Sequence, residues 1–183
     1  SITIPDSVTI IGECAFVLCS SLETVTLGKG VECIGPGVFE GCEKLISVTI
    51  PENVTSIADS AFLGCTSLSS INVVENNANY TSDDGVLFNK DKTELIKYPA
   101  GNTRGNFTIP DSVTTIAGGA FADSNNLTNI AIPNSVATIK AEAFYGCSNL
   151  KNIILPNTLT TIEDSVFENC YVLEDLILPN TLT

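Results

Sequence analysis

The sequence contains no histidine, no tryptophan and no methionine. Without histidine, the chain lacks the commonest general base of enzymes and the commonest side-chain ligand of transition metals. A catalytic base would have to be a carboxylate or a lysine, so a hydrolase is disfavoured. Aromatic residues make up only 7% of the chain, which leaves little material for stacking sugars or bases. We therefore expect a protein that is not an enzyme and that needs no cofactor.

Basic residues are also scarce, because 8 Lys and Arg stand against 21 Asp and Glu, for a formal net charge of −13. A field of this sign repels phosphate backbones and anionic lipids, so no nucleic-acid partner is expected. No apolar run approaches the roughly 18 to 20 residues of a membrane span, and the given residues do not begin with the basic and apolar regions that are typical of a signal peptide. We therefore expect no direct membrane insertion.

What the chain does contain is a 23-residue repeat. Fixed spacings of this kind indicate a stack of similar structural units. With 44% hydrophobic residues, such a stack can bury a continuous core. The period is carried by phenylalanines and prolines: Phe16, Phe39, Phe62, Phe121, Phe144, Phe167, Pro110, Pro133, Pro156 and Pro179.

Each unit begins with an alternating segment that predicts a short strand. Val48 and Ile50 are expected to point inward, while Ser47 and Thr49 point outward. Pro51 ends the strand because it has no N–H to donate. One unit cannot bury its apolar side alone, so neighbours must stack at roughly 4.7 to 4.9 Å into a parallel sheet. The sequence thus predicts a repeat solenoid.

The second half of each unit returns along the opposite wall. Val54 and Ile57 point inward again, and residues 59–62 are compatible with a single helical or 3₁₀ turn. The second position after each repeat phenylalanine holds a residue type that tolerates a left-handed backbone, except in the first unit. Its occupants are Leu18, Gly41, Gly64, Asp123, Gly146 and Asn169.

The pattern I-P-x-S-V-T-x-I-x-x-x-A-F-x-G-C-x-x-L resembles the BspA-like branch of the leucine-rich repeats over nearly the whole chain, in about eight units. The resemblance implies a right-handed superhelix with a parallel β-sheet on the concave face and short 3₁₀ or helical turns or short strands on the convex side. It also implies an association with cell-surface adhesion proteins. We expect a single array over 1–183, cut mid-repeat at both ends from a longer protein.

One unit is longer than the others. Phe62 and Phe121 are 59 residues apart, which is two periods of 23 plus 13 residues. We assign the excess to a 36-residue unit over 74–109, with a polar, turn-prone stretch over 75–85 and a β-hairpin near 85–98. The hairpin is either a structural variation or a ledge for ligand contact. The second interpretation rests on the basic side chains in this region: Lys90, Lys92, Lys97 and Arg104.

Seven cysteines raise the question of disulfides or metal. Five share one repeat position, with Ser124 in the sixth, which predicts a ladder of small buried side chains: Cys19, Cys42, Cys65, Cys147 and Cys170. Cys14 and Cys33 lie outside the ladder, and whether they pair is left open. No metal site is expected, although the turn Asp83-Asp84-Gly85 offers oxygens that suit calcium without the spacing of an EF-hand loop.

The outward strand positions change character halfway along the array. One column runs Ser1, Thr24, Ser47, Ser70, then Asn129, Asn152 and Asp175, and its neighbour runs Thr3, Thr26, Thr49, Asn72, then Ala131, Ile154 and Ile177. The aliphatic row reflects either the strand propensity of isoleucine or a contact surface. Taken as a contact surface, it gives these candidate ligand-binding residues, together with two hairpin lysines: Asn129, Ala131, Asn152, Ile154, Asp175, Ile177, Lys90 and Lys92.

These observations favour an extracellular or cell-surface binding domain. The expected partner is a protein or another macromolecule, such as a host extracellular-matrix component, held on the concave sheet face and the hairpin. The alternative is a passive spacer that supports another domain. The identity of a ligand does not follow from a repeat, because a repeat dictates shape and leaves specificity to the side chains it displays.

Overall fold

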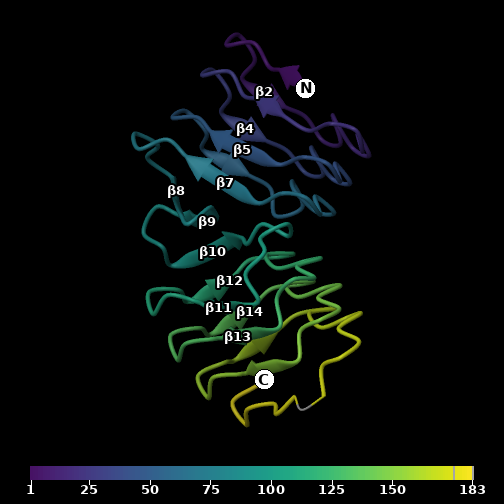
Figure 1. The fold of residues 1–183 in the computed structure, drawn as a ribbon. Helices are drawn as coiled ribbons and strands as arrows, with labels where there is room; N and C mark the ends of the chain where they lie inside the picture. Colours follow the sequence, from purple (N-terminus) through teal and green to yellow (C-terminus); the bar gives the residue numbers. More distant parts are fainter. Residues whose placement is uncertain (175, 183) are drawn as a thin grey trace.

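A computed structural model describes residues 1–174 and 176–182 of the chain. Figure 1 shows a stack of similar turns that runs from the N-terminal turn at one end to the C-terminal turn at the other. The chain forms a parallel β-solenoid of about seven turns, which confirms the predicted fold class. Each turn contacts its neighbours, so the architecture is nearly one-dimensional.

The first strand of each turn lies in a parallel ladder that we call the rung ladder. The inward and outward register follows the sequence prediction: Ile153 is 4% exposed, whereas its neighbour Ile154 is 79% exposed. Strand β5 pairs with β7 through Val48 and Ile71, one period apart. The strands of this ladder are β1 (Ile2–Thr3), β3 (Val25–Thr26), β5 (Ser47–Ile50), β7 (Ser70–Val73), β11 (Asn106–Thr108), β13 (Asn129–Ala131) and β15 (Asn152–Ile154).

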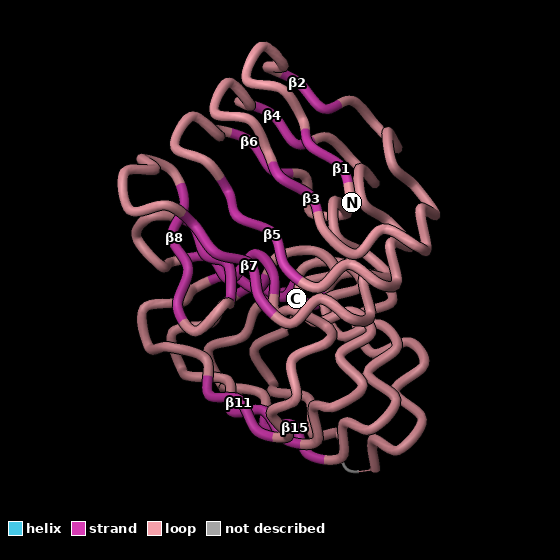
Figure 2. Tube along the Cα trace, turned by 45° about the horizontal axis from the view of Figure 1, so that its top comes forward, coloured by secondary structure: helices cyan, strands magenta, loops and turns pink. Residues whose placement is uncertain are grey.

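A second parallel ladder follows the opposite wall. Its strands are β2 (Ile10–Ile11), β4 (Cys33–Ile34), β6 (Ser56–Ile57), β10 (Glu94–Lys97), β12 (Thr115–Ile116), β14 (Thr138–Ile139) and β16 (Thr161–Ile162). Figure 2 shows strands and loops without helices among the described residues. Residues 59–62 lie in single hydrogen-bonded turns, where Ala61 N–H donates to Ala58 and Leu63 N–H to Ser60, so the segment takes the 3₁₀ alternative and not an α-helical turn. A 23-residue turn leaves too few residues between the ladders for a stable helix.

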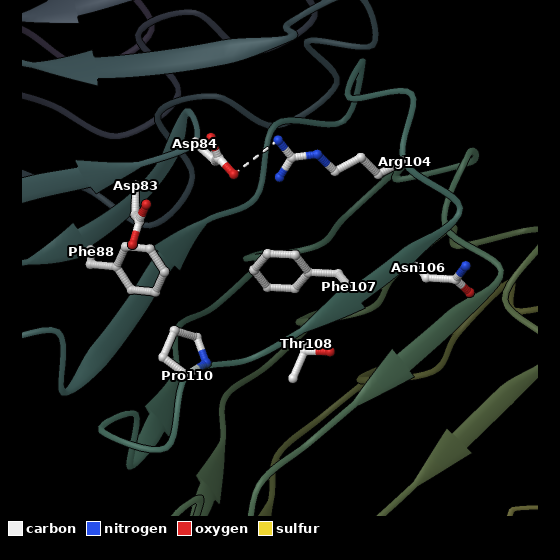
Figure 3. A pocket seen from close by; sticks show the side chains of 8 residues that line it. All are labelled: Asp83, Asp84, Phe88, Arg104, Asn106, Phe107, Thr108 and Pro110. Carbon is white, nitrogen blue, oxygen red and sulfur yellow. Dashed lines mark ion pairs between the residues drawn. The ribbon is translucent and has the colours of Figure 1, made fainter.

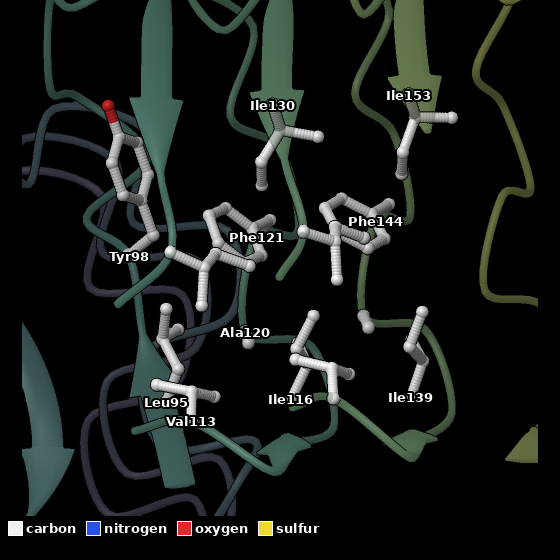
Figure 4. Packing of buried hydrophobic residues seen from close by; sticks show 14 of the residues in the cluster. Leu95, Tyr98, Val113, Ile116, Ala120, Phe121, Ile130, Ile139, Phe144 and Ile153 are labelled. Carbon is white, nitrogen blue, oxygen red and sulfur yellow. The ribbon is translucent and has the colours of Figure 1, made fainter. Parts of the chain in front are cut away.

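Stacked phenylalanines fill part of the interior, where Phe121 and Phe144 lie among buried aliphatic side chains (Figure 4). Phe121 and Phe144 lie 4.9 Å apart between ring centroids and nearly parallel, at 10°. Phe16, Phe39 and Phe62 form a similar stack in the first half. Burying such rings contributes much of the core, because each removes a large apolar area from water. The period of 23 therefore reflects the contact of each ring with its copies in the neighbouring turns.

The turns that follow the phenylalanines use a left-handed backbone. All six positions named from the sequence have φ between 57° and 68°, including Leu18 at 57° and Asp123 at 62°. The left-handed prediction is thus confirmed, and it extends to Leu18, which the sequence pattern made an exception. A Cβ is strained in this region, so Leu18 adopts it because the stack imposes the geometry of its neighbours.

Four thiols of the cysteine ladder each donate a hydrogen bond to the carbonyl oxygen of a repeat phenylalanine in the preceding turn. The thiol of Cys65 donates to the carbonyl oxygen of Phe39 at 3.1 Å, and that of Cys147 donates to Phe121 at the same distance. Cys42 and Cys170 make equivalent bonds. Burial raises the pKa of Cys65 and of Cys147 to about 12. All seven cysteines are free thiols, Cys14 and Cys33 included. Cys42, Cys65 and Cys147 are buried as predicted, whereas Cys19 is exposed.

The expanded turn interrupts both ladders. It contributes β8 (Tyr80–Asp83) and β9 (Val86–Asn89), and β8, β9 and β10 form an antiparallel meander joined to the second ladder through β12. Strand β8 falls in the stretch over 75–85 that was predicted to be polar and turn-prone, with no strand assigned to it. Its sequence is polar and gives no apolar alternation, so only its pairing with β9 defines it. The buried core is divided at this turn into two clusters.

Candidate functional site: the strand face and an open edge

The outward face of the rung ladder, here called the strand face, carries a row of hydrogen-bonded amides in the second half of the molecule. Asn129 Nδ2 donates to Asn106 Oδ1 at 2.7 Å, and Asn152 Nδ2 donates to Asn129 Oδ1 at 2.8 Å. Each amide is thus oriented by the next, because one oxygen accepts while one nitrogen donates. This amide row leaves its remaining donors and acceptors facing solvent at fixed spacing.

Beside the amide row lies an apolar row, formed by Ala131, Ile154 and Ile177. Ile154 is 79% exposed and Ile177 is 82% exposed. Exposed aliphatic side chains in line form an apolar strip on the surface. Asp175, the last predicted member of the amide column, lies outside the described residues.

The two hairpin lysines make internal contacts. Lys90 Nζ donates to the carbonyl oxygen of Asn77 at 2.6 Å, and Lys92 Nζ lies 2.7 Å from Asp83 Oδ2. The Lys92 ammonium also lies 5.9 Å from the centroid of the Phe88 ring. In the part of the chain that the structure describes, neither lysine contacts the amide row through a hydrogen bond or an ion pair. Both lysines stabilise the meander through these contacts. The side chain of Lys92 is still 37% exposed.

Lys97 is not available to a ligand. It is 2% exposed, and its ammonium donates to the carbonyl oxygen of Gly119 at 2.6 Å. Burial lowers its pKa from 10.5 to about 8, because the charged form is poorly solvated there. Counting Lys97 among the basic side chains of a contact ledge was therefore wrong. Lys97 occupies the core position that alanine holds in neighbouring turns, because the N–H of the next residue, Tyr98, donates to Ala120 as that of Phe121 donates to Ala143.

A cleft opens on the strand face where the expanded turn meets β11 (Figure 3). Its volume is about 300 Å³. The turn between β8 and β9 forms one wall and β11 the other, and the ion pair of Arg104 with Asp84, at 3.1 Å, spans the two. Phe107 is half-buried, because no rung strand covers its side that faces the cleft. The residues that line the cleft are Asp83, Asp84, Phe88, Arg104, Asn106, Phe107, Thr108 and Pro110.

The acidic turn does not gather into a metal site. Asp83 pairs with Lys92 and Asp84 with Arg104, and Asp84 has a left-handed backbone with φ at 50°. Among residues 1–174 and 176–182, no group of three or more potential metal ligands occurs. The described residues also include no helix that is long and apolar enough to cross a bilayer.

Comparison with known proteins identifies the family. The model of the BspA-type leucine-rich repeat region matches in six copies, over residues 1–104 and 100–183. The chain belongs to the BspA-type leucine-rich repeat family. The resemblance noted in the sequence is thus confirmed, and the leucine-rich repeat solenoid follows with it. A search of curated proteins found no match.

Solved structures of several bacterial leucine-rich repeat proteins are similar to this chain. The pneumococcal vaccine antigen PcpA superposes with a TM-score of 0.93 at 31% identity, over 99% of this chain and 45% of that one. A leucine-rich repeat protein of Eubacterium ventriosum gives 0.71 at 29% identity, over 94% of this chain and 58% of that one. One from T. pallidum gives 0.57 at 27%, over 95% and 78%. The chain thus spans about half the length of the first two.

Two residues of this leucine-rich repeat face were missed from the sequence. Asn106 and Thr108 continue the amide and apolar rows by one turn, since β11 pairs with β13 in the same register as β13 with β15. The columns read from the sequence passed from Ser70 and Asn72 directly to Asn129 and Ala131. The signal was present in the motif Phe107-Thr108-Ile109-Pro110, which has the phase of a rung strand.

Proposed function

We propose that the chain is a non-enzymatic binding domain of a larger cell-surface or secreted protein, holding a macromolecular ligand on its strand face. The ligand class is a protein, for example a host or extracellular-matrix protein. The observation that carries this proposal is the apolar row beside the amide row, with Ile154 79% and Ile177 82% exposed. Membership of a repeat family with bacterial relatives, one of them a vaccine antigen, supports it.

The chemistry of the two rows suits a protein surface. Aliphatic side chains supply affinity when a partner removes them from water, and a rim of oriented amides supplies hydrogen bonds that set the register. The hydroxyl column of the first half lacks the aliphatic component. Contact is therefore centred on Asn129, Ala131, Asn152, Ile154 and Ile177, the described members of the site. Asp175 continues the amide column in sequence, and Lys90 and Lys92 form a rim on the hairpin.

The test compares two matched double variants of the intact chain. Ile154→Ser with Ile177→Ser removes the apolar row, while Thr26→Ala with Thr49→Ala alters the equivalent positions of the first half. Each is assayed against immobilised extracellular-matrix proteins by surface plasmon resonance. The isoleucine variant should bind about 1 to 3 kcal/mol more weakly than the wild type. The threonine variant should bind like the wild type.

Three outcomes would count against the proposal. An isoleucine variant that binds as tightly as the wild type would remove the apolar row from the site. A threonine variant that loses binding equally would place the contact in the first half. A wild-type chain that retains no matrix or serum protein would favour the passive spacer, which needs a stiff array and no ligand.

A further inference from the structure

The expanded turn creates four strand edges where the two ladders stop and restart. Three of them are covered by the chain itself. Ile57 of β6 donates to the Tyr80 hydroxyl at 3.0 Å, Val73 of β7 donates to Ser82 Oγ at 2.9 Å, and β9 pairs along β10. Side chains and the meander thus replace the missing neighbours of β6, β7 and β10.

The fourth edge, on β11, is not covered. Within the described residues, β11 pairs only with β13 and forms the margin of a three-stranded sheet. Gly105 accepts from Asn129, and Ile109 donates to Ala131, so alternate residues of this segment face β13. Asn106 and Thr108 therefore direct their backbone N–H and C=O groups away from β13, into the cleft. Both residues are exposed.

The same positions are paired in a regular turn. Ile2 donates to the carbonyl oxygen of Thr24 at 3.0 Å, and Ile4 donates to that of Thr26 at 2.8 Å. Thr24 and Thr26 hold the repeat positions of Asn106 and Thr108. The open edge thus has the geometry that elsewhere in this molecule receives a parallel strand.

We propose that the cleft receives an extended segment of a partner protein, which adds to β11 as the missing rung. One apolar side chain of the segment enters the cavity of about 300 Å³ against Phe107, Phe88 and Pro110. Main-chain hydrogen bonds to Asn106 and Thr108 supply the docking, and the cavity selects the side chain, as in other strand additions. A folded surface would not reach these groups between the two walls.

The charge of the cleft selects a basic segment. Asp83 and Asp84 form the wall opposite β11, with 58% and 71% of their side chains exposed, and the net charge of the chain is −13. Arg104 pairs with Asp84 across the opening, but a pair this exposed stabilises the fold little and opens easily. A lysine or arginine that flanks the docked residues replaces Arg104 as the partner of Asp84.

A labelled peptide tests this directly. The probe is acetyl-Lys-Ser-Val-Thr-Ile-Lys-amide, which copies the strand Ser47–Ile50 between two lysines. In the register of β5 on β7, its valine lies opposite Phe107, and its valine and isoleucine N–H groups donate to Asn106 and Thr108. Binding to the intact chain is measured by fluorescence anisotropy, and protection of the Thr108 amide by hydrogen exchange.

Two pairs of changes isolate the backbone edge. Thr108→Pro removes the free N–H without breaking a bond of the fold, as proline is tolerated on the open side of an edge strand; Thr108→Ala keeps that N–H. The proline variant should bind roughly tenfold or more weakly, and the alanine variant within about twofold of the wild type. Methylating the valine and isoleucine nitrogens of the probe should have the effect of the proline, whereas methylating its serine and threonine nitrogens should not.

Several results would overturn the proposal. They are equal binding by the proline and alanine variants, indifference to the site of N-methylation, and no binding of the probe at millimolar concentration. The methylated probes decide the question on wild-type protein if the proline variant unfolds. A dimer in sedimentation that Thr108→Pro dissociates would assign the edge to a second copy instead. Ile154→Ser with Ile177→Ser should leave probe binding unchanged, so this inference and the proposed function can fail separately.

Discussion

The turn that carries Phe144 and the expanded turn that carries Tyr98 have three equivalent interior positions but fill them differently. The backbone N–H of Tyr98 donates to Ala120 just as that of Phe121 donates to Ala143, which sets the equivalence. The three positions are occupied by Ala143, Phe144 and Cys147 in the regular turn and by Lys97, Tyr98 and Gly101 in the expanded one.

This comparison shows what the repeat pattern depends on. Phe144 has a stacked ring on both sides, at 4.9 and 5.6 Å. Among the described residues Tyr98 stacks on Phe121 on one side, and it meets Phe107 edge-on at 4.9 Å. Tyr98 also has a buried hydroxyl with no hydrogen-bond partner among the described residues. A position keeps its repeat identity when identical neighbours on both sides require it. Tyr98, which lies where one neighbour is replaced by the meander, departs from that identity at some cost in stability, whereas Phe62 on the other side of the meander keeps the phenylalanine and stacks on Phe39.

The largest expected effect breaks the regular stack. Phe144→Ala removes a ring that is fully buried between two others, and it should lower the free energy of unfolding by roughly 3 to 5 kcal/mol. Because each turn contacts only its neighbours, protection from hydrogen exchange should fall first in the adjacent turns. Uniform loss of protection from residue 1 onward would contradict the one-dimensional description.

The second prediction removes the buried charge of the expanded turn. Lys97→Met should raise the free energy of unfolding by about 1 to 3 kcal/mol at pH 7, since an apolar side chain of similar length needs no solvation. The folded pKa of about 8 lies below the unfolded value of roughly 10.4, so the unfolded chain binds more protons between these values. The contribution of Lys97 to the stability of the wild type therefore rises with pH between these two pKa values.

The advantage of the methionine variant should accordingly shrink when urea denaturation is repeated at pH 9.5. The thiols of Cys65 and Cys147, whose pKa values are raised to about 12, act in the opposite direction above pH 9 in both proteins. The charge of Lys97 lowers both thiol pKa values, so its removal raises them further and reduces the advantage of the methionine variant in the same direction. A difference that does not change with pH would mean that the pKa of Lys97 is the same in the folded and unfolded states, as for a well-solvated ammonium.

A third, smaller effect is expected from two single variants at ladder positions, one that replaces serine by cysteine and one that replaces cysteine by serine. Ser124 is buried, and its hydroxyl has no hydrogen-bond partner among the described residues. Ser124→Cys should extend a thiol to the carbonyl oxygen of Tyr98, as in the regular turns, and add about 0.5 to 1.5 kcal/mol. The matched change Cys147→Ser should cost a similar amount. Thermal unfolding of the two variants should shift in opposite directions, and shifts of the same sign would refute the ladder's hydrogen bonds.

The smallest expected effect concerns redox conditions. All seven cysteines are free thiols, so a reducing agent should leave the melting temperature unchanged. Exposed Cys14 and Cys19 should react quickly with a thiol reagent in the native protein. Buried Cys65 and Cys147 should react only as the fold opens, because burial raises the pKa of each thiol and blocks access. A drop in melting temperature on reduction would reveal a disulfide.

Much of the strand face was predictable from the sequence, because alternation assigns each side chain to one side of a strand. Ile153 and Ile154 illustrate this, since adjacent identical residues are 4% and 79% exposed, as their phase required. The cleft was not predictable. It depends on how the meander covers β6, β7 and β10 but not β11, and no local pattern in residues 74–109 specifies that packing.

The sequence by itself determined the period, the inward and outward register of the rung strands, the left-handed turns and the cysteine ladder. Each of these repeats every 23 residues, so identical contacts with both neighbours make local pattern and tertiary environment agree. Only the tertiary structure decided the third strand of the meander, the burial of Lys97 and the open edge of β11. These features lie where a turn meets a neighbour unlike itself, and long-range contacts there outweigh local propensity.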